Sequence, residues 1–178
     1  KTAYEIGVRL VGSEMCIRDS PRSPVMQEQL NLKVKYRESF RPFAPSVLRE
    51  DEGEWLEHET HSPYMLLVAD VQNDKRRAMT KEEEALFGID KLNVVRSEIP
   101  AVTHVDYSSR VQTVDNADNP LYHALLTKFK ELTNCPVIAN TSFNVRGEPI
   151  VSSPQDALNT FLNSGLDMLT IGNYIVRK

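Results

Sequence analysis

Short apolar runs along the chain predict a set of β-strands. The longest, YMLLVADV at residues 64–71, has the length and composition of a central strand, and PVIA at residues 136–139 predicts a second buried strand. A further strand begins at residues 46–48, and others are expected at residues 101–105, 110–114, 168–171 and 174–176. A turn at residues 106–109 separates the strand at residues 101–105 from the strand at residues 110–114.

Capping signals place three helices between the strands. In each, a polar residue that can cap a helix is followed by proline, which the first helical position tolerates, at Ser23-Pro24, Asn119-Pro120 and Ser153-Pro154. The first helix is expected to run to about Lys33. Apolar residues at helical spacing give the other two a buried face, formed by Leu121, Leu125, Phe129 and Leu132 in one and by Ala157, Leu158, Phe161 and Leu162 in the other, with Gly165 as a C-cap.

Two polar segments complete the pattern. Residues 51–58 form a charged turn or one short helix, and residues 73–93, the most polar stretch, predict a surface excursion. Thr80 and Glu83 make a capping box, so one or two helical turns are expected within that excursion. Because strands and helices interleave along the chain, we predict a single α/β domain with a mixed sheet flanked by helices.

Composition narrows the class of protein. The 178 residues are 40% hydrophobic and 26% charged, which is typical of one globular domain. The net charge of -4 argues against nucleic acid as the main partner, and no apolar run approaches the roughly 20 residues that span a membrane. Cys16 and Cys135 lie far apart, so neither a metal-thiolate site nor a disulfide framework is expected. No secretion signal is evident, and we expect a cytoplasmic protein.

The beginning of the chain differs in character from the rest. Residues 4–19, YEIGVRLVGSEMCIRD, resemble translated sequencing-adaptor sequence, although the alternation of Ile6, Val8 and Leu10 also fits an ordinary strand. On the first interpretation, residues 1–19 are a non-native segment, residues 20–178 are the domain, and the native sequence is truncated upstream of Ser20.

The first candidate site is a basic cluster. Lys33, Lys35, Arg37 and Arg41 lie within nine residues and are opposed there only by Glu38. If residues 35–37 are extended, Lys35 and Arg37 share a face, where a lysine and an arginine suit an anionic phosphate or carboxylate group. A solvated basic face would have the same composition. The aromatic and proline residues of FRPFAP would fix the direction of the charges, which a solvated face does not require.

The second candidate site is the polar segment NTSFNVRGEP at residues 140–149. It follows a short apolar strand at the carboxyl end, where open α/β sheets tend to bind ligands. Asn140 and Ser142 supply neutral hydrogen-bonding groups, Arg146 adds a cation, and Gly147 permits an unusual backbone angle. The segment could hold a phosphate, a ribose or a carbamoyl amide, or it could be a hydrogen-bonded turn.

Two weaker groups contain histidine. His104 and Asp106 would share a strand face next to Arg110, and His104 is either a catalytic or a structural histidine. His58 and His61 have a spacing that presents two metal ligands only on a helix, and the Ser62-Pro63 sequence favours a loop there. We therefore expect no metal site in this chain.

Four segments, in matching order, closely resemble the C-terminal part of the carbamoyltransferase family. They are NLKVKYRESFRPFAPSVL, PAVTHVDYSSRVQTV, CPVIANTSFNVRGEPIVSSPQDALNTF and GLDMLTIGNYIV. That family includes the nodulation-factor, cephamycin and aminoglycoside O-carbamoyltransferases, and the resemblance covers essentially residues 20–178. It implies a YrdC-like fold, similar to that of threonylcarbamoyladenylate synthase.

The resemblance also implies a reaction and a site. The C-terminal domain of the family is expected to make carbamoyl-adenylate from carbamoyl phosphate and ATP. Lys35 and Arg37 match a K-x-R motif, Asn140 and Ser142 match a Ser/Asn motif in reversed order, and Arg110 resembles a third phosphate contact. These would act by positioning and by stabilising charge, with Arg41, Arg146 and His104 as further binding candidates.

The same resemblance implies partners outside this sequence. Magnesium is expected to accompany ATP through the substrate phosphates, because it needs few protein ligands. An N-terminal domain would bind iron and transfer the carbamoyl group to a hydroxyl of a sugar or natural product, which this chain alone would not do. Two alternatives are a threonylcarbamoyladenylate synthase-like enzyme of tRNA modification and a non-catalytic nucleotide-binding module.

Overall fold

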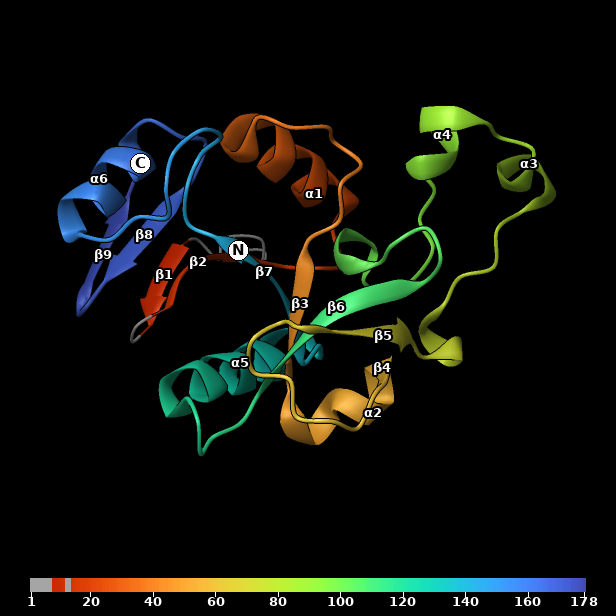
Figure 1. The fold of residues 1–178 in the computed structure, drawn as a ribbon, viewed down its shortest axis with the longest axis horizontal. Helices are drawn as coiled ribbons and strands as arrows, with labels where there is room; N and C mark the ends of the chain where they lie inside the picture. Colours follow the sequence, from red (N-terminus) through yellow and green to blue (C-terminus); the bar gives the residue numbers. More distant parts are fainter. Residues whose placement is uncertain (1–7, 12–13) are drawn as a thin grey trace.

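The computed structural model describes residues 8–11 and 14–178 of the chain. Within these residues, nine strands form one mixed sheet in the order β4-β5-β6-β3-β7-β2-β1-β8-β9 (Figure 1). The pairs β3/β6 and β1/β8 are parallel and the others are antiparallel. The strands are β1 (Val8–Val11), β2 (Glu14–Asp19), β3 (Ala44–Leu48), β4 (Leu56–Glu57), β5 (Leu67–Val71), β6 (Ser108–Val114), β7 (Val137–Ser142), β8 (Met168–Ile171) and β9 (Tyr174–Arg177).

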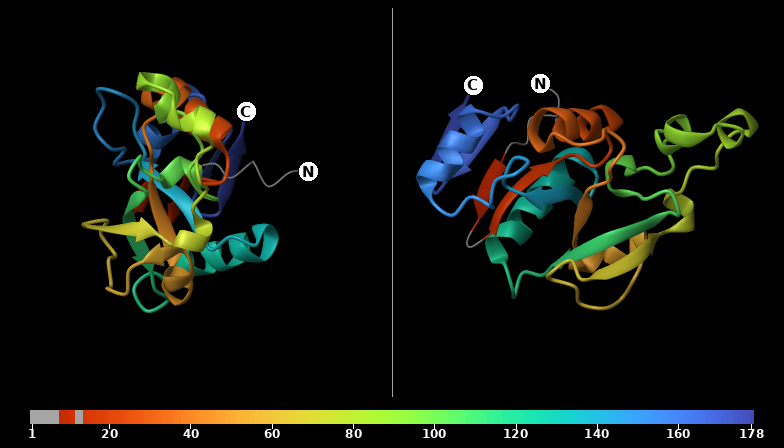
Figure 2. Two further views of the ribbon diagram at one scale, coloured as in Figure 1. Left: turned by 90° about the vertical axis from the view of Figure 1, so that its right-hand side faces the viewer. Right: turned by 45° about the horizontal axis from the view of Figure 1, so that its top comes forward.

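Helices flank this sheet, which confirms the predicted α/β class. α1 and α5 lie on opposite sides of β2 and β7 in Figure 1, and the views of Figure 2 show the same separation. None of the described helices is long and apolar enough to cross a membrane. The α-helices are α1 (Pro24–Leu30), α2 (Glu52–Trp55), α3 (Lys81–Glu84), α4 (Gly88–Leu92), α5 (Pro120–Thr133) and α6 (Pro154–Leu162); a π-helical turn spans Asn31–Lys35, and 3₁₀ turns span Arg49–Asp51, Asn73–Lys75 and Pro100–Val102.

The capping signals in the sequence correctly located the helix starts. Ser23, Asn119 and Ser153 cap α1, α5 and α6 by accepting backbone N–H groups, and proline occupies the first turn of each helix. The capping box of Thr80 and Glu83 is present at the start of α3. The excursion around α3 and α4 projects away from the sheet, as predicted for its polarity (Figure 2).

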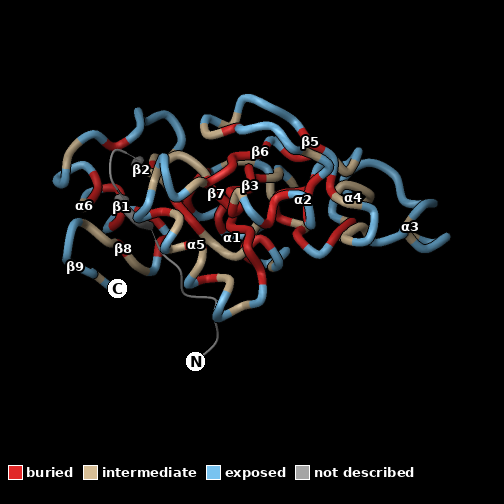
Figure 3. Tube along the Cα trace, turned by 90° about the horizontal axis from the view of Figure 1, so that it is seen from below, coloured by how far each residue is buried: buried red, intermediate tan, exposed pale blue. Residues whose placement is uncertain are grey.

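The core lies between the sheet and its helices, where Figure 3 shows the buried trace. On α5 the buried face is one residue out of step with the prediction: Tyr122, Leu126 and Phe129 are buried, whereas Leu121 and Leu132 are 67% and 72% exposed. Tyr122 packs inward because its ring lies beneath the buried guanidinium of Arg18, 3.9 Å from the ring centroid. The register of the helix is therefore set by this stacking contact as well as by apolar spacing.

Two strand predictions were wrong. Residues 64–71 were expected to form a central strand, but β5 begins only at Leu67 and lies second from the edge of the sheet, with Val68 64% exposed. Residues 101–105 form no strand, because Pro100 starts a 3₁₀ turn there. Backbone bonds from Ala101 to Pro21 and from Phe43 to Ala101 satisfy this turn without a strand partner.

The last part of the chain differs from the prediction in one detail that bears on the site. Gly165 is not the C-cap of α6; Asn163 is. On α6 itself Phe161 is buried but Leu162 is 58% exposed, so Leu162 does not belong to the buried face that was expected. Gly165 instead donates its N–H to the backbone oxygen of Lys33, in the turn that leads to Lys35.

The proposed non-native segment, residues 1–19, lies partly outside the described residues, which omit 1–7 and 12–13. Its described part supplies β1 and β2, with β2 between β7 and β1 in the sheet. Ile17 and Arg18 are buried there. Because packing does not report the origin of a sequence, the non-native interpretation stays a prediction.

Gly165 provides a test of how tightly the C-terminal elements pack against the Lys33 turn. A Cβ at Gly165 would lie 2.7 Å from the Cβ of Lys33, so Gly165→Ala is expected to lower the free energy of unfolding by about 1–3 kcal/mol. Gly53→Ala is the control, because nothing lies within 4 Å of a Cβ there. Urea unfolding followed by circular dichroism measures both. Equal effects of the two substitutions would contradict the tight contact.

Candidate functional site

The strand register places a band of polar side chains on one face of the sheet. Residues that pair across neighbouring strands share a face, and the pairs include Ser46 with Gln112, Ala44 with Asn140, and Cys16 with Ser142. Arg110 lies two residues before Gln112 on β6 and therefore points to the same face. We call Ser46, Arg110, Gln112, Asn140 and Ser142 the polar band.

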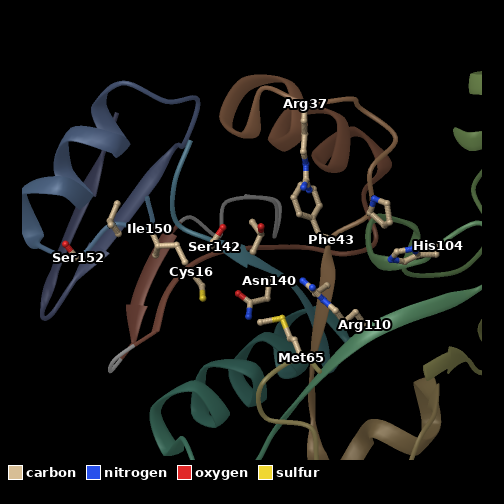
Figure 4. A pocket seen from close by; sticks show the side chains of 14 residues that line it. Cys16, Arg37, Phe43, Met65, His104, Arg110, Asn140, Ser142, Ile150 and Ser152 are labelled. Atoms are coloured by element: carbon tan, nitrogen blue, oxygen red, sulfur yellow. The ribbon is translucent and has the colours of Figure 1, made fainter. Parts of the chain in front are cut away.

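Two hollows lie along this band. The large cavity has a volume of about 870 Å³, and its lining includes Arg37, His104, Arg110, Asn140 and Ser142 (Figure 4). None of the described residues that line it carries a carboxylate, so its charge is positive. The small cavity, about 350 Å³, is lined in part by Lys35, Arg37, Arg41, Ser142 and Arg146. Arg37 and Ser142 line both. Every residue that the family resemblance assigned to the site lines one or the other, whereas Lys33 of the basic cluster lines neither.

Asn31 organises the segment that carries the basic cluster. It is fully buried, and its amide donates to the backbone oxygens of Ser39, at 2.9 Å, and Arg41, at 2.8 Å. Its Oδ1 accepts from Nε of Arg37 at 2.6 Å. Tyr36, with a φ of 46°, reverses the chain between Lys35 and Arg37. The extended geometry predicted for residues 35–37 was therefore wrong, and a wide helical turn followed by a left-handed residue takes its place.

Lys35 joins the two predicted clusters. Its side chain is buried, and its ammonium donates to both the backbone and side-chain oxygens of Ser142 and Asn144, with the Asn144 Oδ1 at 2.8 Å. The pKa of Lys35 is lowered to about 8, chiefly by burial and also by the positive charge of Arg37. With its donors occupied by protein oxygens, Lys35 shapes the loop after β7 in this arrangement of the site.

Arg37 and Arg110 are the cations that face the large cavity. The guanidinium of Arg37 lies 4.8 Å from the centre of the Phe43 ring, and Figure 4 shows it extending toward that ring. Burial lowers the pKa of Arg37, but an arginine remains charged at any pH of interest. The side chain of Arg110 is exposed and makes no hydrogen bond or ion pair with another of the described residues, whereas its backbone pairs with Val68 of β5. Both can donate to an anion without first breaking an ion pair.

Asn140 is held in a chain of hydrogen bonds that runs across the sheet. The side chain of Gln112 donates to the backbone oxygen of Pro63 at 2.9 Å, and its Oε1 accepts from Ser46 Oγ at 2.6 Å and from Asn140 Nδ2 at 2.8 Å. Asn140 is 1% exposed, and its Oδ1 is buried without a hydrogen-bond partner in the described part of the chain. The site thus contains one oriented acceptor among its cations.

The other candidates lie at the rims of the two cavities. Arg41 forms an exposed ion pair with Glu38 at 2.9 Å, and Arg146 donates to the backbone oxygen of Tyr36 at 3.1 Å. His104 lines the large cavity. The prediction that it shares a strand face with Asp106 was wrong, because neither residue lies in a strand. Both residues belong to the turn that precedes β6, where the N–H of Tyr107 bonds to the His104 oxygen.

Three structurally important residues were missed in the sequence: Asn31, Gln112 and Asn144. Asn144 was in the recognised polar segment, but nothing in its type set it apart from its neighbours. Gln112 stands between Val111 and Thr113 in the buried second half of β6, and Asn31 stands between two leucines in a helix. A polar amide at a position expected to be buried was the available signal, because such a group must find hydrogen-bond partners.

The histidine pair near α2 does not form a metal site. His58 contacts the carboxylate of Glu52, and His61 contacts Asp118 at 2.6 Å. Among the described residues no group of three or more His, Cys, Asp or Glu side chains could hold a metal ion.

Known proteins similar to this chain share its full extent. The family described as carbamoyltransferase C-terminus matches residues 1–178. The uncharacterized protein sll1178 of Synechocystis is 53% identical over 98% of this chain and 28% of its own length. Nodulation protein NolO of Bradyrhizobium diazoefficiens is 38% identical over 98% of this chain and 28% of its own length. The 3'-hydroxymethylcephem-O-carbamoyltransferase of Amycolatopsis lactamdurans is 31% identical over 96% of this chain and 28% of its own length. The chain thus spans about a quarter of the length of these relatives.

Replacing Lys35 tests whether it shapes the loop after β7. Lys35→Met removes the bonds to Ser142 and Asn144, so amide hydrogen exchange over residues 142–147 is expected to accelerate about tenfold or more. Lys128→Met is the matched control, because that ammonium bonds to Glu131 on the exposed surface of α5, away from the loop after β7. Hydrogen-exchange mass spectrometry compares the two; unchanged exchange in Lys35→Met would refute the role.

Proposed function

Since the chain belongs to the carbamoyltransferase C-terminus family, we propose that it binds ATP and carbamoyl phosphate and forms carbamoyl-adenylate. The observation that carries this proposal is the meeting of Arg37, Arg110 and Asn140 in one cavity that has no described carboxylate in its lining. The guanidinium groups of Arg37 and Arg110, neither of which is held in an ion pair with another described residue, suit phosphate oxygens, and a neutral amide suits a carbamoyl group. A volume of about 870 Å³ is within the range of nucleotide-sized ligand pockets.

The proposed reaction has two balanced steps. Water first cleaves carbamoyl phosphate into carbamate and inorganic phosphate. A carbamate oxygen then attacks the α-phosphorus of ATP; a P–O bond forms there, the bond to the β-phosphate bridging oxygen breaks, and pyrophosphate leaves. Magnesium accompanies ATP on its phosphates and offsets part of their charge.

The chain's own contribution to this chemistry is to position groups and stabilise charge. Arg37 and Arg110 offset the negative charge that builds on the phosphate oxygens, and they act strongly because they need little reorganisation. Arg37 is prepared for this by Asn31 and by stacking on Phe43. Lys35 keeps Ser142 and Asn144 in place beside them.

The full activity of a carbamoyltransferase extends beyond this domain. We propose that the relatives' additional length includes the part that binds iron and passes the carbamoyl group to a hydroxyl of a sugar or natural product. One relative is a 3'-hydroxymethylcephem-O-carbamoyltransferase by name, which supports a hydroxyl group as the acceptor. On this proposal the present chain has a YrdC-like fold and supplies the activated carbamoyl group in the cytoplasm. The selection of the acceptor belongs to the other part of the enzyme.

Pyrophosphate release tests the reaction. With ATP and magnesium, we expect pyrophosphate to form only when carbamoyl phosphate is also present, because carbamate is the attacking group. An enzyme-coupled pyrophosphate assay with and without carbamoyl phosphate measures this. Equal rates in the two conditions, or no pyrophosphate in either, would contradict the catalytic proposal; tight ATP binding without turnover would favour a non-catalytic nucleotide-binding module.

Arg110 tests where the phosphates bind. Arg110→Met should weaken ATP binding about tenfold or more in a calorimetric titration, because an unpaired guanidinium that donates to phosphate is lost. Arg77→Met is the control: that side chain is paired with Glu83 on the excursion near α3, away from the cavity lining. Equal affinities of the Arg110 and Arg77 variants would place the phosphates elsewhere.

A further inference from the structure

The hydrogen bonds around Asn140 determine which end of its amide is free. Pro63 offers Gln112 only a carbonyl oxygen, which accepts and cannot donate, so the Nε2 end of Gln112 must face it. The Oε1 end of Gln112 then faces Ser46 and Asn140. Asn140 must present its Nδ2 to that oxygen, and its Oδ1 is turned the other way. The amide orientation therefore follows from chemistry, whatever the difficulty of telling nitrogen from oxygen by shape.

This orientation leaves an acceptor with an unmet requirement. The Oδ1 of Asn140 is buried and has no hydrogen-bond partner among the described residues, which is unfavourable compared with a satisfied group. Asn140 lines the large cavity, next to Arg110 in Figure 4. A ligand that meets this requirement must bring an N–H or O–H donor, because phosphate and carboxylate oxygens would only add repulsion.

The two nearby guanidinium groups restrict the chemical class of the ligand further. Arg37 and Arg110 line the same cavity and suit a phosphate group. A carbamoyl group carries an –NH₂ only a few bonds from the phosphate that it is attached to. In ATP the ribose hydroxyls lie more bonds away from the phosphates, and the amino group of adenine lies at the opposite end of the molecule. The carbamoyl amide is the donor that can reach Asn140 while its phosphate stays with the arginines.

We propose that Asn140 Oδ1 accepts an N–H of the carbamoyl group, and that Gln112 is the positioning residue that keeps this acceptor turned toward the ligand. The inference rests on the proposed function and deepens it, because it names the feature that distinguishes the substrate from close analogues. Acetyl phosphate has the same charge and nearly the same shape as carbamoyl phosphate, but it has a methyl group in place of the –NH₂. The site discriminates against it by leaving Asn140 unsatisfied.

The test compares the binding of these two ligands to the intact chain by calorimetry in the cold. The wild-type chain should bind carbamoyl phosphate about tenfold more tightly than acetyl phosphate, the equivalent of one buried hydrogen bond. Gln112→Met frees the Asn140 amide to rotate. The affinity for carbamoyl phosphate should then fall to about that for acetyl phosphate, while the acetyl phosphate affinity is unchanged. Gln72→Met, whose side chain bonds to Gly53 away from the cavity, is the control.

The outcomes separate this inference from the proposed function. If the wild-type chain binds both ligands equally, or if Gln112→Met keeps the preference, the inference is overturned while the phosphate site stands. If Gln112→Met weakens both ligands alike, Gln112 is only structural and its positioning role is wrong. Should Gln112→Met fail to fold, Asn140→Leu must abolish the preference, since Gln112 keeps its bond to Ser46 there. Binding of neither ligand to the wild-type chain would overturn the proposed function as well.

Discussion

The buried ammonium of Lys35 is the interaction on which the geometry of the site depends. It bonds to oxygens of Ser142 and Asn144, which are more than a hundred residues away along the chain. A buried charge is costly unless it is paired or fully hydrogen-bonded, so these oxygens must surround it for the fold to be stable. Once they do, the turn after α1 and the loop after β7 have a fixed relative position, and Arg37 and Asn140 line one cavity.

A second constraint acts across the sheet. The polar band places charged and amide groups on a face that would ordinarily be apolar, and hydrogen bonds link its buried amides from Pro63 through Gln112 to Asn140. Such a network specifies orientation as well as position. The free Oδ1 at its end is the single member that the described protein groups leave unsatisfied, and the cavity is where a ligand can complete it.

The sequence was informative about local structure and less so about long-range contacts. The proline-containing caps at Ser23, Asn119 and Ser153 fixed helix starts because capping is a short-range interaction. The face of α5 was misjudged because the Arg18–Tyr122 contact joins distant segments. Lys35 and Asn140 were selected from motifs, but the roles of Asn31 and Gln112 could not be recognised from the sequence, because an amide becomes important through the partners that the fold brings to it.

The close approach of Gly165 to Lys33 has a consequence for how the protein is made. The turn that carries Lys35 rests against a segment near the end of the chain, and β1 pairs with β8 on the same side of the sheet. A ribosome releases the early residues first, so the basic cluster emerges long before the elements that support it. The turn that carries Lys35 is therefore fully supported only once the segment around Gly165 has been synthesised and has folded against it.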